Sequence, residues 1–469
     1  MLFSSIPFLY YFLPIVLVMY FLVPAGLKNG ILLAASLFFY GWGEGRYLFL
    51  MLAVIMATFF LTLLMARGRQ KGRKGEEKLF LFLALTVNIA TLSYFKYADF
   101  FIHNFNQATG LALPLLRVAL PIGISFYVFQ LISYIVDVYR KDVEAQKNPV
   151  LLAAYVSMFP QLIAGPIVRY FTIEKQLTER KTEVGEIAVG IRRFILGLGK
   201  KVILANTLGE CCEGFRQSQE KTVLFFWLYG AAFMLHIYFD FSGYSDMAIG
   251  LGKIMGFSFP ENFRYPYTAK SITEFWRRWH ISLGTWFRDY VYIPLGGNRV
   301  EKRRWLLNLA IVWLLTGFWH GAAWNFIVWG LYFAVFLVAE KLWLFPWLNK
   351  GRAVPHLYVI LVVMISFIIF DAGSLFEAVY HIRGLWGGEG QTALSTESIY
   401  FWQSYRQVLL IAIIGATPLP ALLLQKIREG KKGKMLLAIV EPLVLAGLLL
   451  VITAYLVDGS FNPFLYFRF

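Results

Sequence analysis

The chain has 469 residues, of which 58% are hydrophobic and 15% are charged, and its formal net charge is +16. A soluble domain of this length does not need so much apolar surface, whereas lipid-facing helices do. The basic residues lie between apolar segments, as the positive-inside bias of cytoplasmic loops requires, so we expect membrane lipid around the chain and no nucleic-acid partner. The composition predicts an all-α, multi-pass membrane protein.

Apolar segments long enough to cross or enter a bilayer follow one another along the chain. Several are shorter than the ~20 residues that an upright helix needs, so tilted and re-entrant helices are expected among about eleven crossings. No internal repeat is visible, and residues 1–469 are predicted to form a single integral-membrane domain. The segments are 7–23, 30–41, 46–66, 79–96, 113–137, 150–167, 188–207, 222–240, 305–317, 319–340, 355–370, 407–424 and 435–457.

The ends of the chain and its loops predict an orientation. Residues 7–23 lie in an uncharged stretch without a basic n-region, so they are predicted to be a retained first helix. The basic loops 67–74, 264–304 and 426–434 are predicted to be cytoplasmic. Two further segments are predicted to lie outside, residues 384–405, which contain no Lys or Arg, and residues 461–469.

The two cysteines, Cys211 and Cys212, are adjacent. Neighbouring cysteines do not readily form a relaxed disulfide with each other, and two ligands do not make a structural zinc site. We therefore expect neither a disulfide nor a metal site.

The segment 264–304 is too polar to span a membrane and unusually rich in Trp and Tyr. If 272–288 is one helix, Glu274 and Arg278 pair at i,i+4, whereas Trp276 and His280 share another face. Two interpretations remain open. The helix either lies in the interface, anchored by its tryptophans, or dips into the protein and carries His280 to membrane depth.

Arg277 and Arg278 in the same segment are candidates for binding the phosphates of a donor, since a guanidinium binds phosphate in a bidentate manner. Contact with lipid head groups, or a pair with Glu274, explains them equally well.

His320 lies between apolar residues and is predicted to sit within the bilayer. An ionisable group at that depth is costly and often marks a functional pathway, although a lone histidine can also be a satisfied structural group. Gly317 and Gly321 form a Gly-x-x-x-Gly pair that lets another helix approach. Trp313 and Trp324 are predicted to share the helical face of His320.

A buried imidazole far from carboxylates is expected to be neutral, and a neutral imidazole can accept a proton from an attacking hydroxyl. The sequence contains no Gly-x-Ser-x-Gly, His-Glu-x-x-His or Walker-type motif. A general base without a metal or a nucleophile elbow suits direct acyl transfer from a thioester to a hydroxyl.

Several stretches together carry a family resemblance. They are 121–130, 159–169, 238–246, 275–280 with 294–298, and 318–325, in one collinear order over most of the chain. On these stretches the chain resembles the membrane-bound O-acyltransferase (MBOAT) superfamily, in the branch of alginate and cell-wall polysaccharide O-acetyltransferases.

The resemblance implies that His320 is the essential histidine and His280 its companion. It also implies a ring of tilted helices around a central tunnel, with funnels from both faces meeting near the histidine. The donor would be acetyl-CoA as a substrate, with no bound cofactor. An extracytoplasmic partner of the SGNH-hydrolase type would pass the acetyl group to a polysaccharide outside the bacterial inner membrane.

Further polar residues lie in the resembling stretches. Asp240 and Tyr244 either contact the donor or hold a helix break together by hydrogen bonds. Trp276, Trp319 and Asn325 are also binding candidates, and Asn325 can orient His320 only if the helix bends. At Asp371 the chain departs from the Arg-Ala of its relatives, which leaves the acceptor open.

Two other functions remain as alternatives. One is acyl transfer in teichoic acid D-alanylation, with a carrier-protein thioester as donor. The other is a proton-coupled transporter or flippase that uses the histidines as proton relays.

Overall fold

The computed structural model describes residues 1–469 except 349, 389, 460–464 and 466–469. Among the described residues the regular elements are all helices, which confirms the all-α prediction. The chain divides into two compact units, Met1–Phe194 with Met247–Pro260, and Ile195–Asp246 with Glu261–Phe469. The prediction of a single domain stays a prediction.

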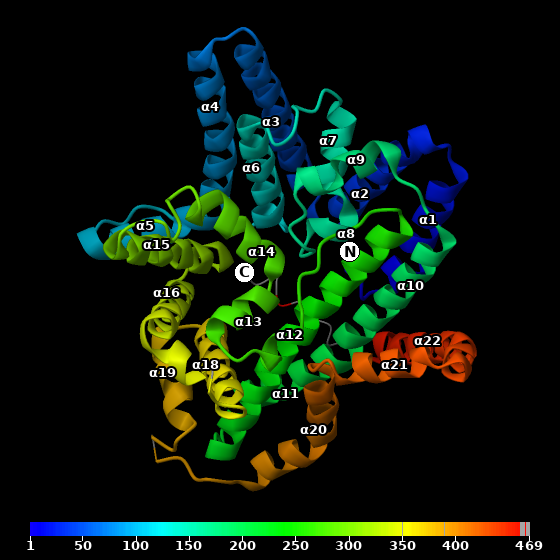
Figure 1. The fold of residues 1–469 in the computed structure, drawn as a ribbon. Coiled ribbons are helices and arrows are strands. Elements are labelled where there is room, and N and C mark those ends of the chain that lie inside the picture. The colour runs from blue at the N-terminus through cyan, green and yellow to red at the C-terminus, as the bar shows by residue number, and fades with distance from the viewer. Residues whose placement is uncertain (349, 389, 460–464, 466–469) are drawn as a thin grey trace. The chain divides into compact units, whose positions relative to one another are not determined.

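The first unit contains the helices of the N-terminal part of the chain (Figure 1). They are η1 (Pro7–Phe12), α1 (Leu13–Leu22), η2 (Ala25–Leu27), α2 (Lys28–Glu44), α3 (Tyr47–Gln70), α4 (Lys74–Leu92), η3 (Ser93–Tyr97), α5 (Ala98–Thr109), α6 (Ile124–Arg140), α7 (Pro149–Ser157), α8 (Phe159–Leu162), α9 (Tyr170–Glu179) and the first part of α10 (Val184–Gly199).

Within this unit α3, α4 and α6 run side by side (Figure 1). Arg69 ties the ends of these helices together, because its guanidinium pairs with Glu77 at 2.6 Å and donates to the carbonyls of Val138 and Tyr139. A side chain that satisfies two helix-end carbonyls replaces hydrogen bonds that the helix itself cannot make. The contact fixes the end of α6 against the hairpin of α3 and α4.

The second unit contains the helices that follow. They are η4 (Lys200–Ala205), α11 (Asn206–Gln217), most of α12 (Val223–Ile254), η5 (Pro266–Thr268), α13 (Ile272–Arg278), α14 (Ile281–Phe287), η6 (Arg288–Tyr292), α15 (Lys302–His320), α16 (Trp324–Ala339), η7 (Glu340–Leu344), α17 (Phe345–Leu348), α18 (Val354–Asp371), α19 (Leu375–Gly384), α20 (Thr396–Gly415), α21 (Leu419–Glu429) and α22 (Lys431–Asp458).

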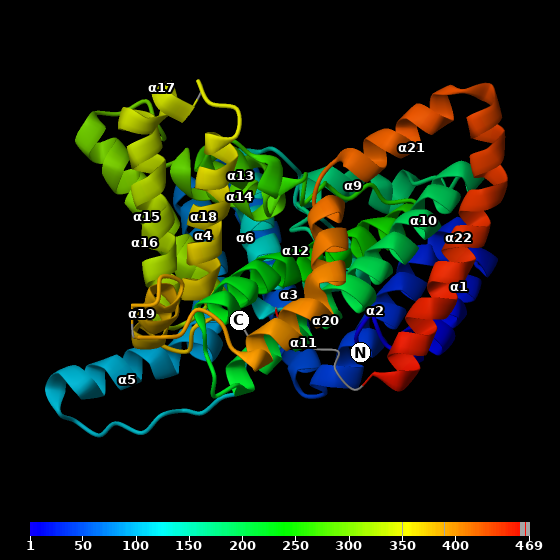
Figure 2. The same cartoon turned by 90° about the horizontal axis from the view of Figure 1, so that it is seen from below.

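In the second unit α16 packs against both α15 and α18, as the view in Figure 2 shows. The core between them is aromatic: Trp329 and Phe333 of α16 are buried, as is Phe367 of α18. Cys211 and Cys212 are buried free thiols within α11.

Six helical segments among the described residues are long and apolar enough to span a membrane. They are Tyr47–Gln70, Lys74–Thr109, Val223–Ile254, Trp324–Leu348, Val354–Asp371 and Lys431–Asp458. A seventh is possible if Thr396–Gly415 and Leu419–Glu429, bent by 59°, form one span. The chain is thus a multi-pass membrane protein, but the prediction of about eleven crossings is not confirmed.

Prolines explain two differences from the predicted segments. The segment 113–137 is helical only from Ile124 onward, and 150–167 is broken at Met158 between α7 and α8. Pro114 and Pro121 disfavour helical geometry in the residues before them, and Pro160 has no N–H to bond the carbonyl of Val156, so α7 cannot continue through it. Apolar composition alone does not reveal such breaks.

Candidate active site

His320 is the last residue of α15, and its side chain is buried with 5% of its surface exposed. Its imidazole meets the rings of Trp319, Trp329 and Phe370 nearly edge-on, with centroids 4.9, 5.0 and 5.3 Å away. The chain then runs extended through Gly321 before α16 begins. The prediction that Trp324 shares the face of His320 is therefore wrong, since Trp324 starts the next helix and is 55% exposed.

Glycines bring α15 and α16 into close contact beside His320. A Cβ atom at Gly317 would lie 2.2 Å from the carbonyl oxygen of Phe326, and one at Gly330 would lie 2.2 Å from that of Trp313. A Cβ at Gly321 would meet the Phe326 ring at 2.2 Å. The close approach predicted from Gly317 and Gly321 is confirmed, and α16 is the approaching helix.

His280 lies at a break between α13 and α14, so the expected continuous helix over 272–288 is wrong. Trp279 is extended, and His280 has a φ of +43°, a left-handed conformation that costs energy for a residue other than glycine. Trp276 and His280 consequently do not share a helical face. The imidazole is 1% exposed.

Asn262 holds His280 in this conformation and sets its tautomer. The Asn262 Oδ1 atom accepts from the backbone N–H of Ser282 at 3.2 Å and from its hydroxyl at 2.9 Å, so it is the acceptor for Nδ1 of His280 at 3.1 Å. Nδ1 therefore carries the proton and Nε2 carries the lone pair. His280 lies outside the candidate spans, and its burial lowers its pKa to about 3, which keeps the ring neutral.

Trp319 contacts both histidines. Its ring centroid is 5.9 Å from that of His280 and 4.9 Å from that of His320. Phe241 of α12 covers another side of His280 at 4.6 Å. The structure thus brings together three of the predicted site residues, His280, Trp319 and His320, in one aromatic environment.

Trp329, which contacts His320, and Trp276, which contacts Trp329, have buried indole nitrogens without an acceptor among the described residues. Their rings are 5.7 Å apart, and the Trp276 ring also packs on Trp313 at 4.6 Å. A buried N–H without an acceptor costs about 1–3 kcal/mol, so such groups are usually matched by a bound molecule or water. Of these two donors, Trp276 lines a cavity.

Two cavities of about 950 and 540 Å³ adjoin each other, since Thr273, Arg277, Arg288 and Leu337 line both of them. Arg277 and Arg288 line both of them, and Arg299 and Lys341 line the larger one. The smaller cavity reaches Trp276, Trp313 and Thr316, and Thr316 precedes His320 by one turn of α15. Neither of these two cavities is lined by His280 or His320. The tunnel expected from the resemblance stays a prediction.

The neighbouring arginines differ in what they bind. Arg278 pairs with Glu274 at 2.5 Å, as predicted, and donates to the Thr268 hydroxyl at 3.0 Å. Arg277 is exposed and faces the two cavities. Of the two, Arg277 is the better placed to meet a phosphate.

Glu340 is a residue that the sequence reasoning missed. Its buried carboxylate accepts from the backbone N–H groups of Ile272 and Thr273, from the Thr273 hydroxyl at 2.7 Å and from the Tyr358 hydroxyl at 3.2 Å. It therefore caps the N-terminus of α13, the helix that carries Trp276 and Arg277. The available signal was an acidic residue closing the apolar run 319–340.

Two other predicted binding residues, Asp240 and Asn325, bind partners within the protein. Asp240 forms a buried ion pair with Lys201 at 2.6 Å and accepts from the backbone N–H of Leu465 at 3.0 Å. Asn325 donates to the carbonyls of Phe370 and Ala372 at the end of α18, at 3.3 and 3.0 Å. Both arrangements satisfy buried groups of the fold.

Tyr244 is buried in α12. Asp371, where the chain departs from its relatives, pairs with Arg216 and accepts from the Tyr229 hydroxyl at 2.5 Å. Asp371 therefore has partners within the protein.

The fold and these contacts define a class: a multi-pass membrane protein with a buried histidine at a helix end, an indole ring packed on that histidine and a basic cavity in the same unit. The model of the MBOAT, membrane-bound O-acyltransferase family, matches residues 35–376. The chain belongs to this family, and it is an acyltransferase.

Three relatives show how widely the similarity extends. A probable alginate O-acetylase AlgI of Pseudomonas putida is 38% identical over 100% of both chains, and one of Azotobacter vinelandii is 43% identical over 80% of this chain and 76% of its own. A peptidoglycan O-acetyltransferase of Helicobacter pylori is 34% identical over 83% of this chain and 80% of its own.

Proposed function

We propose that the protein is a membrane O-acetyltransferase that takes acetyl groups from cytoplasmic acetyl-CoA for the O-acetylation of a polysaccharide outside the bacterial inner membrane. The names of the relatives support an acetyl group and a glycan acceptor. The single observation that carries the chemistry is the buried imidazole of His320 at the end of α15. An SGNH-type partner would carry the acetyl group onward to the polymer.

In this reaction His320 acts as the general base. Its unprotonated nitrogen takes the proton of the acceptor hydroxyl while the hydroxyl oxygen attacks the thioester carbonyl carbon. A C–O bond forms, the C–S bond breaks, and the proton goes to the departing CoA sulfur. The C-terminal end of α15 favours the transient positive charge on the ring, because helix carbonyls point toward it.

His280 is assigned a positioning role. With its Nδ1 proton bound to Asn262, its Nε2 can accept a hydrogen bond but cannot donate one. Trp319 contacts both rings, so His280 acts on the orientation of Trp319 and of a bound substrate hydroxyl. This role differs from that of the base.

The basic cavity supports a donor that carries phosphates. Arg277, Arg288 and Arg299 line it, and guanidinium groups bind phosphates through paired hydrogen bonds. The donor's thioester would then lie toward Trp276 and Trp329, whose indole N–H groups can stabilise the negative charge that develops on the carbonyl oxygen. Acetyl-CoA has both chemical features.

Replacing the base tests the proposal. The substitution His320→Ala should abolish polysaccharide acetylation while the protein stays folded in the membrane. The matched control is His381→Ala, since His381 is also buried among aromatic rings but lies in α19. Wild-type acetylation by the His320 variant would overturn the assignment.

A second experiment tests the donor. Acetyl-CoA should protect the purified protein against thermal unfolding, because a ligand that binds only the folded state stabilises it. Arg277→Gln should weaken that protection. A requirement for a charged carrier protein, with no effect of acetyl-CoA, would instead support the D-alanylation alternative.

A further inference from the structure

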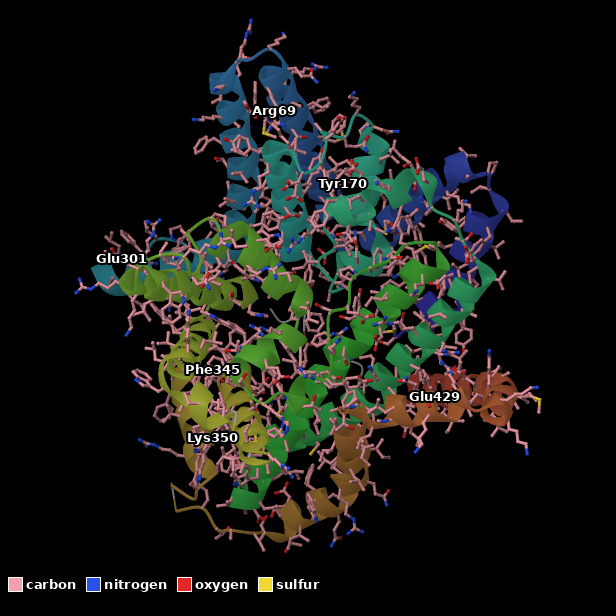
Figure 3. The ribbon with its side chains drawn as sticks, viewed as in Figure 1. Arg69, Tyr170, Glu301, Phe345, Lys350 and Glu429 are labelled. Atoms are coloured by element: carbon pink, nitrogen blue, oxygen red, sulfur yellow. The ribbon has the colours of Figure 1, made fainter. Side chains whose placement is uncertain are left out.

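A second basic cavity lies within the first unit, and none of the residues assigned to catalysis above lines it. Its volume is about 640 Å³, and it lies between the ends of α3 and α6 and the segment after α6. Arg67, Lys141 and Lys147 line it, and Glu144 is the one carboxylate in its lining. The labelled Arg69 in Figure 3 marks this end of α3.

The cations of this cavity differ in their partners. Arg69 is committed to the fold, since it pairs with Glu77 and binds two carbonyls. Arg67, Lys141 and Lys147 form no ion pair with any residue in the described part of the chain. Three positive charges facing one cavity repel one another, and a bound anion removes that repulsion.

Part of the lining of the cavity is apolar. Leu63 and Ala66 of α3 contribute to it, as do Val138 and Val143. A free anion gains nothing from such a wall, whereas an amphiphile buries its chain there at about 25 cal/mol per Å² of apolar surface. The lining therefore matches a molecule with an anionic head and a hydrocarbon tail.

The cavity also lies where lipid head groups are found. It is at the end of the candidate span Tyr47–Gln70, next to the basic loop 67–74. Basic pockets between helices at the edge of a membrane bind anionic lipid head groups. A volume of 640 Å³ accommodates a phosphoglycerol head with the first carbons of its chains.

We infer that this cavity is a binding site for an anionic phospholipid, with the phosphate held by Arg67, Lys141 and Lys147 and the acyl chain lying against Leu63 and Val143. The site is independent of the acyl-transfer reaction. Occupation of the site ties α3 to the end of α6 and stabilises the first unit.

The test uses the full chain in a mild detergent, with phosphatidylglycerol, phosphatidylcholine or inorganic phosphate added. Phosphatidylglycerol should raise the Tm and remain bound in native mass spectrometry. The variant R67Q/K141Q/K147Q should bind it at least about 10-fold more weakly, in line with the loss of charge-assisted hydrogen bonds.

The matched control is K71Q/K74Q/K78Q. It removes the same charge from exposed residues of the neighbouring loop and helix that do not line the cavity. Equal loss of binding in both variants, or equal binding of phosphatidylcholine, would overturn the site. Stabilisation by inorganic phosphate alone would overturn the lipid assignment. Lys141→Gln alone should show a smaller loss and keeps the test valid if the triple variant does not fold.

Discussion

Gly317→Ala is expected to damage both the stability and the activity of the protein. The new Cβ would lie 2.2 Å from the backbone oxygen of Phe326, whereas real Cβ atoms essentially never come closer than 3.0 Å. Because the new Cβ would meet a backbone atom, a change of side-chain rotamer cannot relieve the clash. The helices α15 and α16 must therefore move apart. Overpacking of this kind costs about 1–3 kcal/mol.

The activity should fall more than the stability alone explains. Gly317 lies one turn before His320, so a displacement of α15 moves the imidazole against Trp329. A misplacement of about 1 Å at a reacting group can cost on the order of 100-fold in rate. We expect a reduced kcat in protein that is still folded at the assay temperature.

Two buried cysteines provide a probe of unfolding, and a glycine in α22 provides a control substitution. Cys211 and Cys212 are buried free thiols, so a thiol-reactive dye reports unfolding of the second unit, and transfer from labelled acetyl-CoA reports activity. Gly447→Ala in α22 adds the same methyl where nothing lies within 4 Å, and it should be neutral or slightly stabilising. A Gly317→Ala variant with the Tm and kcat of wild type would refute the packing argument.

Three further predictions concern the site. Trp329→Phe keeps an aromatic ring but loses the indole N–H that is proposed to stabilise the oxyanion. The kcat should therefore fall by about 100-fold, with little change in Tm, and an unchanged kcat would contradict this role. Glu340→Gln should raise the KM for acetyl-CoA more than it lowers kcat, because α13 loses its anionic cap while His320 is unchanged. Equal effects on KM and kcat would contradict this role of Glu340. Since the pKa of His280 is lower in the folded protein than its ordinary value of 6.5, stability should fall by up to about 1.4 kcal/mol per pH unit below pH 6.5, and His280→Asn should make the Tm less dependent on pH there.

Composition and hydrophobic segments predicted the helical class and the multi-pass character of the chain, because both follow from the amount and spacing of apolar residues. They did not predict the breaks at Met158 and His280. A proline within an apolar run causes the first break. The second depends on Asn262, whose side-chain oxygen accepts from the backbone N–H of Ser282, a group that an unbroken helix would satisfy itself.

The two histidines were predicted as site residues from their setting, and in the structure both rings contact Trp319. The partners of Asp240 and Asn325 could not be predicted, since Lys201 and the carbonyl of Ala372 are distant in sequence. Glu340 was missed for the same reason. A capping contact between η7 and α13 exists only once the helices are packed.

Chemical rescue tests the central claim most directly. Replacing His320 by Ala removes a buried ring and leaves space beside Trp329, into which free imidazole can diffuse. Transfer of labelled acetyl from acetyl-CoA should fall by about 100- to 10,000-fold in the variant, as for the loss of a general base. Added imidazole should restore part of the rate, and the restoration should follow the fraction of unprotonated imidazole as the pH changes. A variant that transfers acetyl at the wild-type rate without imidazole would contradict the account.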